Sequence, residues 1–468
     1  MNKLKKNSEN ILIFLLFCFL IFILSFNILH YDPVFGYDGE AHHEYVQNFL
    51  NLYPTWENDQ LSKNYTYEFF SPPLPYVFPA FINEVCKRYI NFVSGNIYDN
   101  CRIFYGFVNM IFNTSLFIYL LFIYQKITNL FFKKNSYFNL TTILVMILFT
   151  ANYRTILMLR GELYILLLNS LMLYQFLKIY KNNFKFIYKD ILKFGFIIGG
   201  LALSRQWAFL LFPAYFLTII FVKNKEEKIR YLEFITKSFV IGFAISSWFY
   251  FDLYLNYGTF TAFNMESTRF SFNNQPSNFY NPFNKEALFM FSKPIRGYFT
   301  NQFFPVLYSD LWGDYWGYFS FTSRDLNSGR NQLLIGDYLA RVNIVSIFPT
   351  ILLFFGFGKA LNYFKNNNQY ENSLFIKLIV LCSVSSFFGY FIFLIKYAEP
   401  TGDTIKATYI IQLFHLLGIL SIFSLESLKV NKPNFYNLIV FIYIVILLHN
   451  FSAMMSHFPY QNVFNLGI

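Results

Sequence analysis

The sequence predicts an all-α polytopic membrane protein, and three observations carry that prediction. Of the 468 residues, 55% are hydrophobic and only 13% are charged, whereas an average soluble domain has roughly 25% charged residues. Apolar runs close to the length of a transmembrane helix recur along the chain, and basic residues gather in alternate loops between them. We therefore expect a single domain over residues 1–468, with about eleven transmembrane helices and two extracytoplasmic segments.

The first apolar run covers residues 11–30 and follows Lys3, Lys5 and Lys6. No small-residue cleavage site follows this run, so we expect an uncleaved transmembrane helix with its N-terminus in the cytoplasm. Further runs are expected to span the membrane, several of them short or kinked. They lie near residues 103–124, 138–152, 156–177, 191–204, 207–222, 235–254, 342–358, 374–395, 405–425 and 435–452.

Basic residues cluster in the loops that this order of spans places in the cytoplasm. The clusters lie within residues 126–134, 178–189, 223–230, 359–365 and 429–432. Because cytoplasmic loops are enriched in Lys and Arg, this asymmetry supports the predicted topology. It also accounts for the net charge of +11, so we do not expect a nucleic-acid partner.

Two long segments fall outside the membrane in this topology, residues 31–101 and residues 255–340. The second mixes charged residues with many aromatic ones, as expected of a cap at the membrane surface. Cys86 and Cys101 lie in the first segment, where a disulfide in an oxidising compartment and two unpaired thiols are both open alternatives. The chain has no Cys-x-x-Cys pair and no fixed metal-ligand spacing, so we assign neither a metal nor a cofactor.

The decapeptide GYDGEAHHEY at residues 36–45 places several ionisable side chains directly after the first apolar run. In a helix that begins near Asp38, residues four apart share a face, which groups Asp38 with His42. Ionisable residues at a membrane are functional candidates, although Asp38 would also suit a helix N-cap. We therefore take Asp38 and Glu40 as candidate catalytic residues and His42 and His43 as residues of a substrate cavity, with structural roles as the alternative.

A second motif, SPPLPY at residues 71–76, is expected to form a stiff turn. Pro72 and Pro73 lack a backbone donor and hold φ at about −65°. We expect these prolines and Tyr76 to shape the cavity and to take no direct part in chemistry.

The order of these motifs, and the side of the membrane on which they fall, resemble the GT-C glycosyltransferases of the protein O-mannosyltransferase and aminoarabinose transferase type. The residues that carry the resemblance are Asp38, Glu40 and His43, followed by residues 71–74 and Tyr76. Through its topology the resemblance extends over most of the chain. It implies a GT-C-like bundle that uses a polyprenyl-phosphate sugar donor and a lipid, glycan or protein acceptor. It also implies an extracytoplasmic site in a lipid bilayer, which we expect to be a bacterial inner membrane.

The implied reaction transfers a sugar to an acceptor hydroxyl or amine with inversion at the anomeric carbon. A carboxylate near the acceptor can take its proton during the attack, and such general-base catalysis is worth about 10² to 10⁴ in rate. Asp38 is our candidate for this base. The phosphate is a good leaving group, so no general acid is required.

The leaving phosphate does require cations, because charge that develops in a low-dielectric site is stabilised by fixed positive groups. Lys406 is the first candidate, since the resemblance implies a Lys or Arg at the start of a late transmembrane run. Arg205, between two short runs, is the second, and snorkelling to the membrane surface is the alternative for both. Asp403, in the same GDTIK string as Lys406, is assigned to the substrate cavity.

Asp310 and Asp314 lie in an aromatic stretch at residues 308–318. Aromatic rings can stack on a sugar and carboxylates can bind its hydroxyls, so both aspartates are assigned to the substrate cavity. Anchoring of the rings at the membrane interface is the alternative interpretation.

Two other functions are compatible with the sequence. A transporter or flippase of a lipid-linked sugar would use the same charges to hold a phosphate, but the inverted repeats typical of such proteins are not evident. A ligase or polymerase of surface polysaccharide would use a diphosphate donor. The sequence identifies neither the sugar nor the acceptor.

Overall fold

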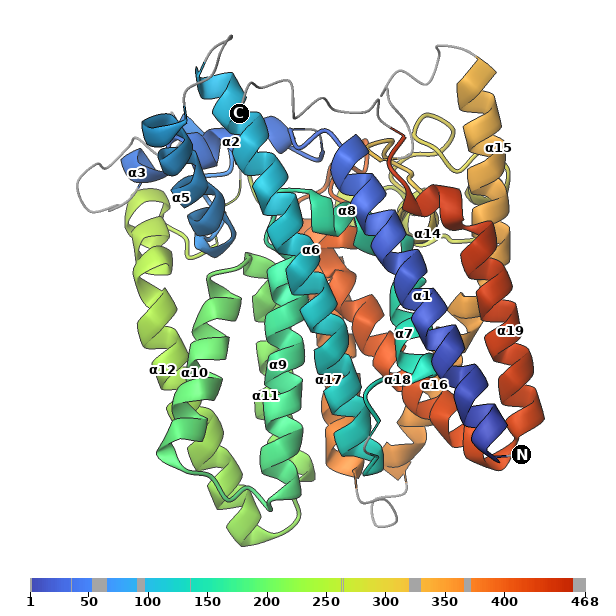
Figure 1. The fold of residues 1–468 in the computed structure, drawn as a ribbon. Coiled ribbons are helices and arrows are strands. Elements are labelled where there is room, and N and C mark those ends of the chain that lie inside the picture. Colours follow the sequence, from blue (N-terminus) through green and yellow to red (C-terminus); the bar gives the residue numbers. More distant parts are fainter. Residues whose placement is uncertain are drawn as a thin grey trace.

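The computed structural model describes residues 2–34, 36–52, 65–90, 97–134, 136–261, 263, 265–319, 330–365 and 372–457. Every regular element within these ranges is an α-helix or a 3-10 helix, and an isolated bridge joins Arg296 to Phe299. The long helices run side by side, and shorter helices gather at the end of the bundle opposite the N-terminus (Figure 1). The prediction of an all-α fold is confirmed for the described residues.

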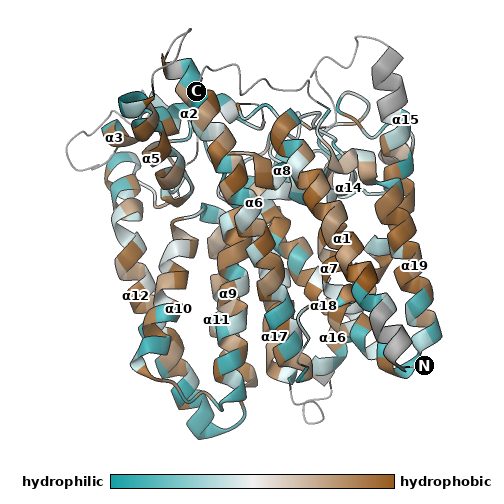
Figure 2. Cartoon of the chain, in the orientation of Figure 1, coloured by the Kyte–Doolittle hydropathy of each residue, from teal (hydrophilic) through white to brown (hydrophobic). Residues whose placement is uncertain are grey.

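Seven helices in the described ranges are long and apolar enough to cross a membrane. They lie in α1 (Asn2–His30), α6 (Ile97–Phe132), α9 (Glu162–Lys181), α12 (Lys225–Tyr257), α15 (Arg330–Val345) continuing into α16 (Ile347–Lys365), α17 (Ser373–Lys396), and η6 (Ala407–Ile410) continuing into α18 (Ile411–Asn431). Figure 2 shows apolar residues along the length of these helices and hydrophilic ones concentrated toward the ends of the bundle. This arrangement is consistent with an integral membrane protein.

The other predicted spans fall on short or broken helices. The run at residues 138–152 falls on α7 (Leu140–Ile147) and α8 (Thr150–Leu157), which are bent by 71° relative to each other. This pair would be an eighth span if the two helices are counted as one. The remaining runs correspond to α10 (Tyr188–Ala202), to η2 (Gln206–Leu210), α11 (Phe212–Leu217) and η3 (Thr218–Phe221), and to α19 (Pro433–His449). Each predicted run is therefore largely helical, while the count of about eleven spans stays a prediction.

The two segments predicted outside the membrane lie at the same end of the bundle (Figure 1). The first contains α2 (Gly39–Gln47), α3 (Phe49–Leu52) and α5 (Leu74–Tyr89). The second contains η4 (Phe272–Asn274), α13 (Ser277–Tyr280), η5 (Ala287–Phe291) and α14 (Phe303–Trp312). Helix η7 (Phe451–Met454) follows α19.

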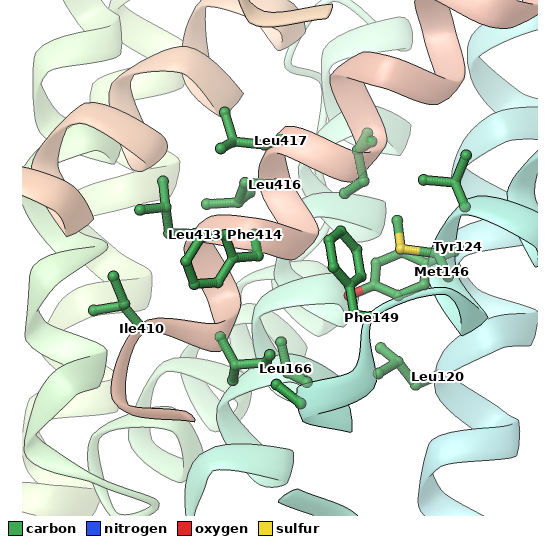
Figure 3. Packing of buried hydrophobic residues seen from close by; sticks show 14 of the residues in the cluster. Leu120, Tyr124, Met146, Phe149, Leu166, Ile410, Leu413, Phe414, Leu416 and Leu417 are labelled. Atoms are coloured by element: carbon green, nitrogen blue, oxygen red, sulfur yellow. The ribbon is translucent and has the colours of Figure 1, made fainter. Parts of the chain in front are cut away.

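One hydrophobic core connects the helices of the bundle. Its buried side chains extend from Ile13 in α1 to Met454 in η7. Figure 3 shows side chains of this core from α18, among them Leu416, together with Phe149, which lies between α7 and α8, and Tyr124 of α6. The rings of Phe149 and Tyr124 both contact His415 of α18. From Ile411 to Glu426, α18 is buried on all sides, in agreement with the apolar residues found around the whole helix.

Cys86 in α5 and Cys101 in α6 form a disulfide, with their Cα atoms 5.7 Å apart. Of the two alternatives left by the sequence, the structure therefore shows the bonded one. Such a bond persists in an oxidising compartment. It cross-links positions separated by 15 residues, and closing a loop of this size stabilises a fold by about 3 kcal/mol in the chain-entropy model.

We expect replacement of both cysteines, Cys86→Ser with Cys101→Ser, to lower the free energy of unfolding by about 3 kcal/mol. The measurement is the melting temperature of the purified protein in detergent without reductant. Cys18→Ser, at an exposed unpaired thiol of α1, is the matched control and should melt like the wild type. Equal melting temperatures for the double variant and the wild type would contradict the prediction.

Candidate functional site

A cavity of about 290 Å³, the first cavity, is lined by residues from both ends of the chain. Its ionisable wall is formed by Asp38, Glu68, Arg205, Glu399, Asp403 and Lys406. Aromatic side chains form another part of the wall, among them Trp207, Phe393, Tyr397 and Tyr409. The predicted base and both predicted phosphate-binding cations therefore share one cavity.

Asp38 and Lys406 form an ion pair, with Lys406 Nζ 3.6 Å from Asp38 Oδ2. The Lys406 side chain is 9% exposed and that of Asp38 is 47% exposed. Partial burial raises the pKa of Asp38, but the charges of Lys406 and Arg160 more than offset this and leave that pKa below its ordinary value. Asp38 is therefore an ionised carboxylate at neutral pH.

The backbone around Asp38 explains how its carboxylate reaches the cavity. Asp38 occupies the N-cap position of α2, but its side chain makes no capping hydrogen bond. Its φ of 53° is in the left-handed region, which Asp tolerates better than most residues do. A Cβ at the next residue, Gly39, would lie 2.3 Å from the carbonyl oxygen of Val34, so the tight turn requires glycine there. The N-cap alternative is therefore not the role of this side chain.

The backbone around Lys406 is held by three buried side chains. The Tyr390 hydroxyl accepts a hydrogen bond from the Lys406 amide at 2.9 Å. The Trp316 indole donates to the preceding carbonyl at 3.0 Å, and Asp310 Oδ2 accepts from the amide of Ala407 at 2.6 Å. Lys406 thus extends from a fixed loop, and its ammonium also lies 4.9 Å from the centre of the Tyr37 ring.

Arg205 is held between two buried carboxylates. Its Nη1 lies 3.0 Å from Glu68 Oε2 and its Nε lies 3.3 Å from Glu162 Oε1. The Ser71 hydroxyl accepts from Arg205 and donates to Glu68. A side chain bound on both sides in this way is a fixed cation in the cavity wall and does not snorkel.

Glu68 is a site residue that the sequence reasoning missed. Burial raises its pKa, but Arg205, Arg160 and the Ser71 hydrogen bond together hold that pKa below its ordinary value. Glu68 is thus a buried, ionised carboxylate. Its position three residues before the SPPLPY motif was the available signal, and a solvated loop glutamate would have looked the same in the sequence.

The string Arg160-Gly161-Glu162 supplies the remaining charges behind the first cavity. Arg160 Nε lies 3.5 Å from Glu162 Oε2, and the guanidinium lies 5.1 Å from the centre of the Tyr409 ring. A Cβ at Gly161 would lie 2.1 Å from the carbonyl oxygen of Ser204, the residue before Arg205. Glycine therefore allows the start of α9 to reach the segment that carries Arg205.

We expect Gly161→Ala to destabilise the protein by about 1–3 kcal/mol, because the added methyl group would overlap a backbone oxygen. The melting temperature in detergent measures this effect. Gly358→Ala in α16 is the matched control, since nothing lies within 4 Å of the methyl position there. A normal melting temperature for Gly161→Ala would show that the two segments are not in close contact.

A second cavity, of about 720 Å³, shares Asp38 and Glu68 with the first. Its wall also includes Asp32, Glu40, Glu44, Tyr67 and Tyr318. Glu40 is 63% exposed and pairs with Arg102 Nη1 at 2.6 Å. Asp38 therefore stands at the boundary of two cavities, and Glu40 lines the second of them only.

His42 and His43 lie behind the cavity walls, contrary to the prediction. His42 Nδ1 lies 2.7 Å from the Tyr76 hydroxyl, and His43 Nδ1 lies 2.8 Å from the Tyr105 hydroxyl. Burial lowers the pKa of His42 well below its ordinary value and that of His43 to about 4. Both imidazoles are therefore neutral and position the helices, and Tyr76 is likewise buried behind the wall.

Asp310 and Asp314 also differ from the prediction, because both are 0% exposed and line neither cavity. Asp314 accepts hydrogen bonds from the amides of Tyr318 and Phe319. Asp310 bonds within the fold as well, including the Ala407 contact described above. Both carboxylates accept hydrogen bonds from other groups of the chain, so they are not available to the hydroxyls of a sugar.

The other predicted residues lie at the cavity or beside it. Pro72 lines the first cavity, and Pro73 takes the N-cap position of α5. Asp403 lines the first cavity and lies 3.7 Å from Arg296 Nη2.

The fold and the site together define an all-helical protein with spans suited to a membrane and a cavity lined by ion pairs at one end of the bundle. In the described part of the chain, no group of three or more His, Cys, Asp and Glu side chains is arranged to hold a metal ion. Comparison with protein-family models, curated proteins and solved structures finds no match to this chain.

Proposed function

We propose that the protein is an inverting glycosyltransferase that moves a sugar from a polyprenyl-phosphate donor to an acceptor hydroxyl or amine. The observation that carries the proposal is the Asp38–Lys406 pair, in which Asp38 lines both cavities and Lys406 lines the first. A transfer between two substrates needs a base beside the acceptor and a cation beside the leaving phosphate. Asp38 would be the base and Lys406 the cation, and their charged atoms lie 3.6 Å apart.

In the proposed reaction, the acceptor oxygen or nitrogen bonds to the anomeric carbon on the face opposite the phosphate. The bond from the anomeric carbon to the phosphate oxygen breaks, and its electron pair leaves with the polyprenyl phosphate. The acceptor proton passes to the Asp38 carboxylate. Because the transition state resembles an oxocarbenium ion, the acceptor becomes acidic as the new bond forms, and a weak base is sufficient.

Lys406 and Arg205 are proposed to hold the donor phosphate in the first cavity. Arg205 is fixed in place by Glu68 and Glu162, so its charge needs no reorganisation during the reaction. A phosphate bound to Lys406 would draw this cation away from Asp38. The pKa of Asp38 would then rise toward its ordinary value, which makes the carboxylate a better base when the donor is present.

The acceptor is proposed to enter by the second cavity, where Asp38 meets Glu40. Glu40 is held by Arg102 at the rim, which suits a positioning role toward the acceptor. Tyr67 and Tyr318 in the same wall offer aromatic faces for a sugar or an apolar group.

An extracytoplasmic location for the site is supported by two observations. The segments that carry the site lie at the end of the bundle opposite the start of α1 (Figure 1). The start of α1 lies at the second end, together with the last residues of α6 and α9 and the first residues of α12. Basic residues gather in the loops at that second end, as expected of cytoplasmic loops. The disulfide lies in a segment of the site end, where an oxidising compartment would preserve it. A bacterial inner membrane is the proposed location.

The test is incubation of the purified protein with a labelled polyprenyl-monophosphate sugar and a panel of lipid, glycan and protein acceptors. We expect label to move to an acceptor in the wild type and not in Asp38→Ala. A parallel reaction with the polyprenyl-diphosphate sugar identifies a ligase or polymerase. If intact donor crosses the bilayer of a liposome and no acceptor is labelled, the protein is a transporter and the proposal is wrong.

A further inference from the structure

We propose that Asp310 is a positioning residue that sets the separation of Asp38 and Lys406, an inference that rests on the proposed function. Asp310 Oδ1 accepts a hydrogen bond from the Tyr37 hydroxyl at 2.9 Å. Its Oδ2 accepts from the amide of Ala407 at 2.6 Å. Tyr37 directly precedes the base and Ala407 directly follows the cation, so one buried carboxylate joins the two segments.

Arg154 keeps the Asp310 carboxylate from rotating. Its Nη2 donates to Asp310 Oδ1 at 2.8 Å, and its Nη1 donates to the carbonyl oxygen of Gly313 at 2.7 Å. The Arg154 side chain is fully buried in α8, directly after the bend that follows α7. The broken helix pair thus anchors the end of α14, and α14 presents Asp310 to the site.

The chemistry of these contacts requires a carboxylate at position 310. Donors reach both oxygens: a hydroxyl and a guanidinium at Oδ1 and a backbone amide at Oδ2. An asparagine has one acceptor oxygen, so its NH₂ group would face a donor on one side or the other. Two donors that face each other in a buried site cannot bond, so the segment that carries the displaced donor moves away. That segment holds either Asp38, next to Tyr37, or Lys406, next to Ala407.

The consequence for catalysis follows from the sensitivity of transfer reactions to geometry. A misplacement of about 1 Å can reduce a rate roughly 10²-fold. We expect Asp310→Asn to reduce kcat by about this factor, because the displaced segment carries either the base or the phosphate-binding cation, while Asp310 itself lines neither cavity. Tyr37→Phe removes one donor and leaves the other two, so its effect should be smaller and in the same direction.

The experiment combines turnover with a readout that needs no substrate. The rate at which acetic anhydride acetylates Lys406 at fixed pH is measured by mass spectrometry of the modified peptide. Loss of the Asp38 partner makes the free amine more abundant, so Asp38→Asn provides the reference for an unpaired Lys406. Asp310→Asn should move the acetylation rate severalfold toward this reference. Glu426→Gln, at a buried carboxylate of α18 that pairs with Lys134, is the matched control and should label like the wild type.

The possible outcomes are distinct. A folded Asp310→Asn protein with wild-type kcat and wild-type Lys406 acetylation overturns the positioning role. If Asp310→Asn does not fold, Tyr37→Phe decides the question by the same two measurements. Faster acetylation in Asp310→Asn, combined with no sugar transfer by the wild type, supports the positioning role and overturns the proposed function.

Discussion

Asp38→Asn is expected to reduce sugar transfer about 10² to 10⁴-fold, the contribution of a general base. The amide cannot accept the acceptor proton, while Asn tolerates the left-handed backbone at this position. The side chain makes no capping hydrogen bond, so the start of α2 should be kept, and the melting temperature reports the cost of losing the Lys406 partner. The measurement is kcat for transfer from the labelled polyprenyl-phosphate sugar, together with the melting temperature.

A carboxylate outside both cavities provides the control for this variant. Glu84→Gln in α5 changes a partly exposed side chain that pairs with Lys87, and it should leave transfer unchanged. Transfer that survives in Asp38→Asn would show that Asp38 is not the base.

The pH dependence of the same reaction reports on the Lys406 partner. Because Lys406 and Arg160 lower the pKa of Asp38 in the protein without substrate, the acid limb of the kcat/KM profile, which reports the free enzyme, should lie below the ordinary range of an aspartate, about pH 3.9. Lys406→Met removes one of these charges and leaves the effect of burial, so the acid limb of its residual activity should move to higher pH. An acid limb that stays in place would show that Lys406 does not influence the base.

Arg205→Ala is expected to be the most destabilising single change at the site. It removes the partner of Glu68 and one partner of Glu162, both of them buried. Removal of one member of a buried ion pair typically costs about 3–5 kcal/mol, because a buried charge is left uncompensated. The melting temperature in detergent should fall accordingly, and binding of the labelled donor should weaken as well.

Two further variants separate charge from geometry in the Arg205 cluster. Arg205→Lys keeps the charge but loses the planar fork that reaches two carboxylates, so its stability should be intermediate. Arg205→Met combined with Glu68→Gln removes both charges of one pair and should recover part of the loss. A wild-type melting temperature for Arg205→Ala would contradict the buried network.

The stability conferred by Glu68 should also depend on pH. The pKa of Glu68 is lowered in the folded protein. Its contribution to the free energy of unfolding is therefore fully present above the ordinary glutamate pKa of about 4.3, and it is lost as the pH falls through the pKa that Glu68 has in the folded protein. The difference in melting temperature between the wild type and Arg205→Ala should therefore narrow in acid. If this difference in melting temperature widens in acid, groups other than Glu68 cause the pH dependence.

The candidate site was partly accessible from the sequence. Asp38 and Arg205 could be selected because charged residues beside an apolar run are unusual. Lys406 was selected because the resemblance implies a cation at the start of a late transmembrane run. Glu68 gave no comparable signal, since its importance comes from Arg205, a partner distant in sequence. Glu162 could be paired with its neighbour Arg160 from the sequence, but its contact with Arg205 could not be predicted. His42 was placed on the face of Asp38 by helical spacing, yet its burial against Tyr76 depends on where α5 packs.

The sequence by itself determined the helical, membrane-suited character of this protein, because apolar runs and the basic loops between them are local properties of the chain. Only the tertiary structure decided that Cys86 is bonded to Cys101, that Asp38 meets Lys406, and that Asp310 serves the fold instead of lining a cavity. Each of these outcomes depends on how segments far apart in sequence pack together. Burial then decides which charges are paired with one another and which face a cavity.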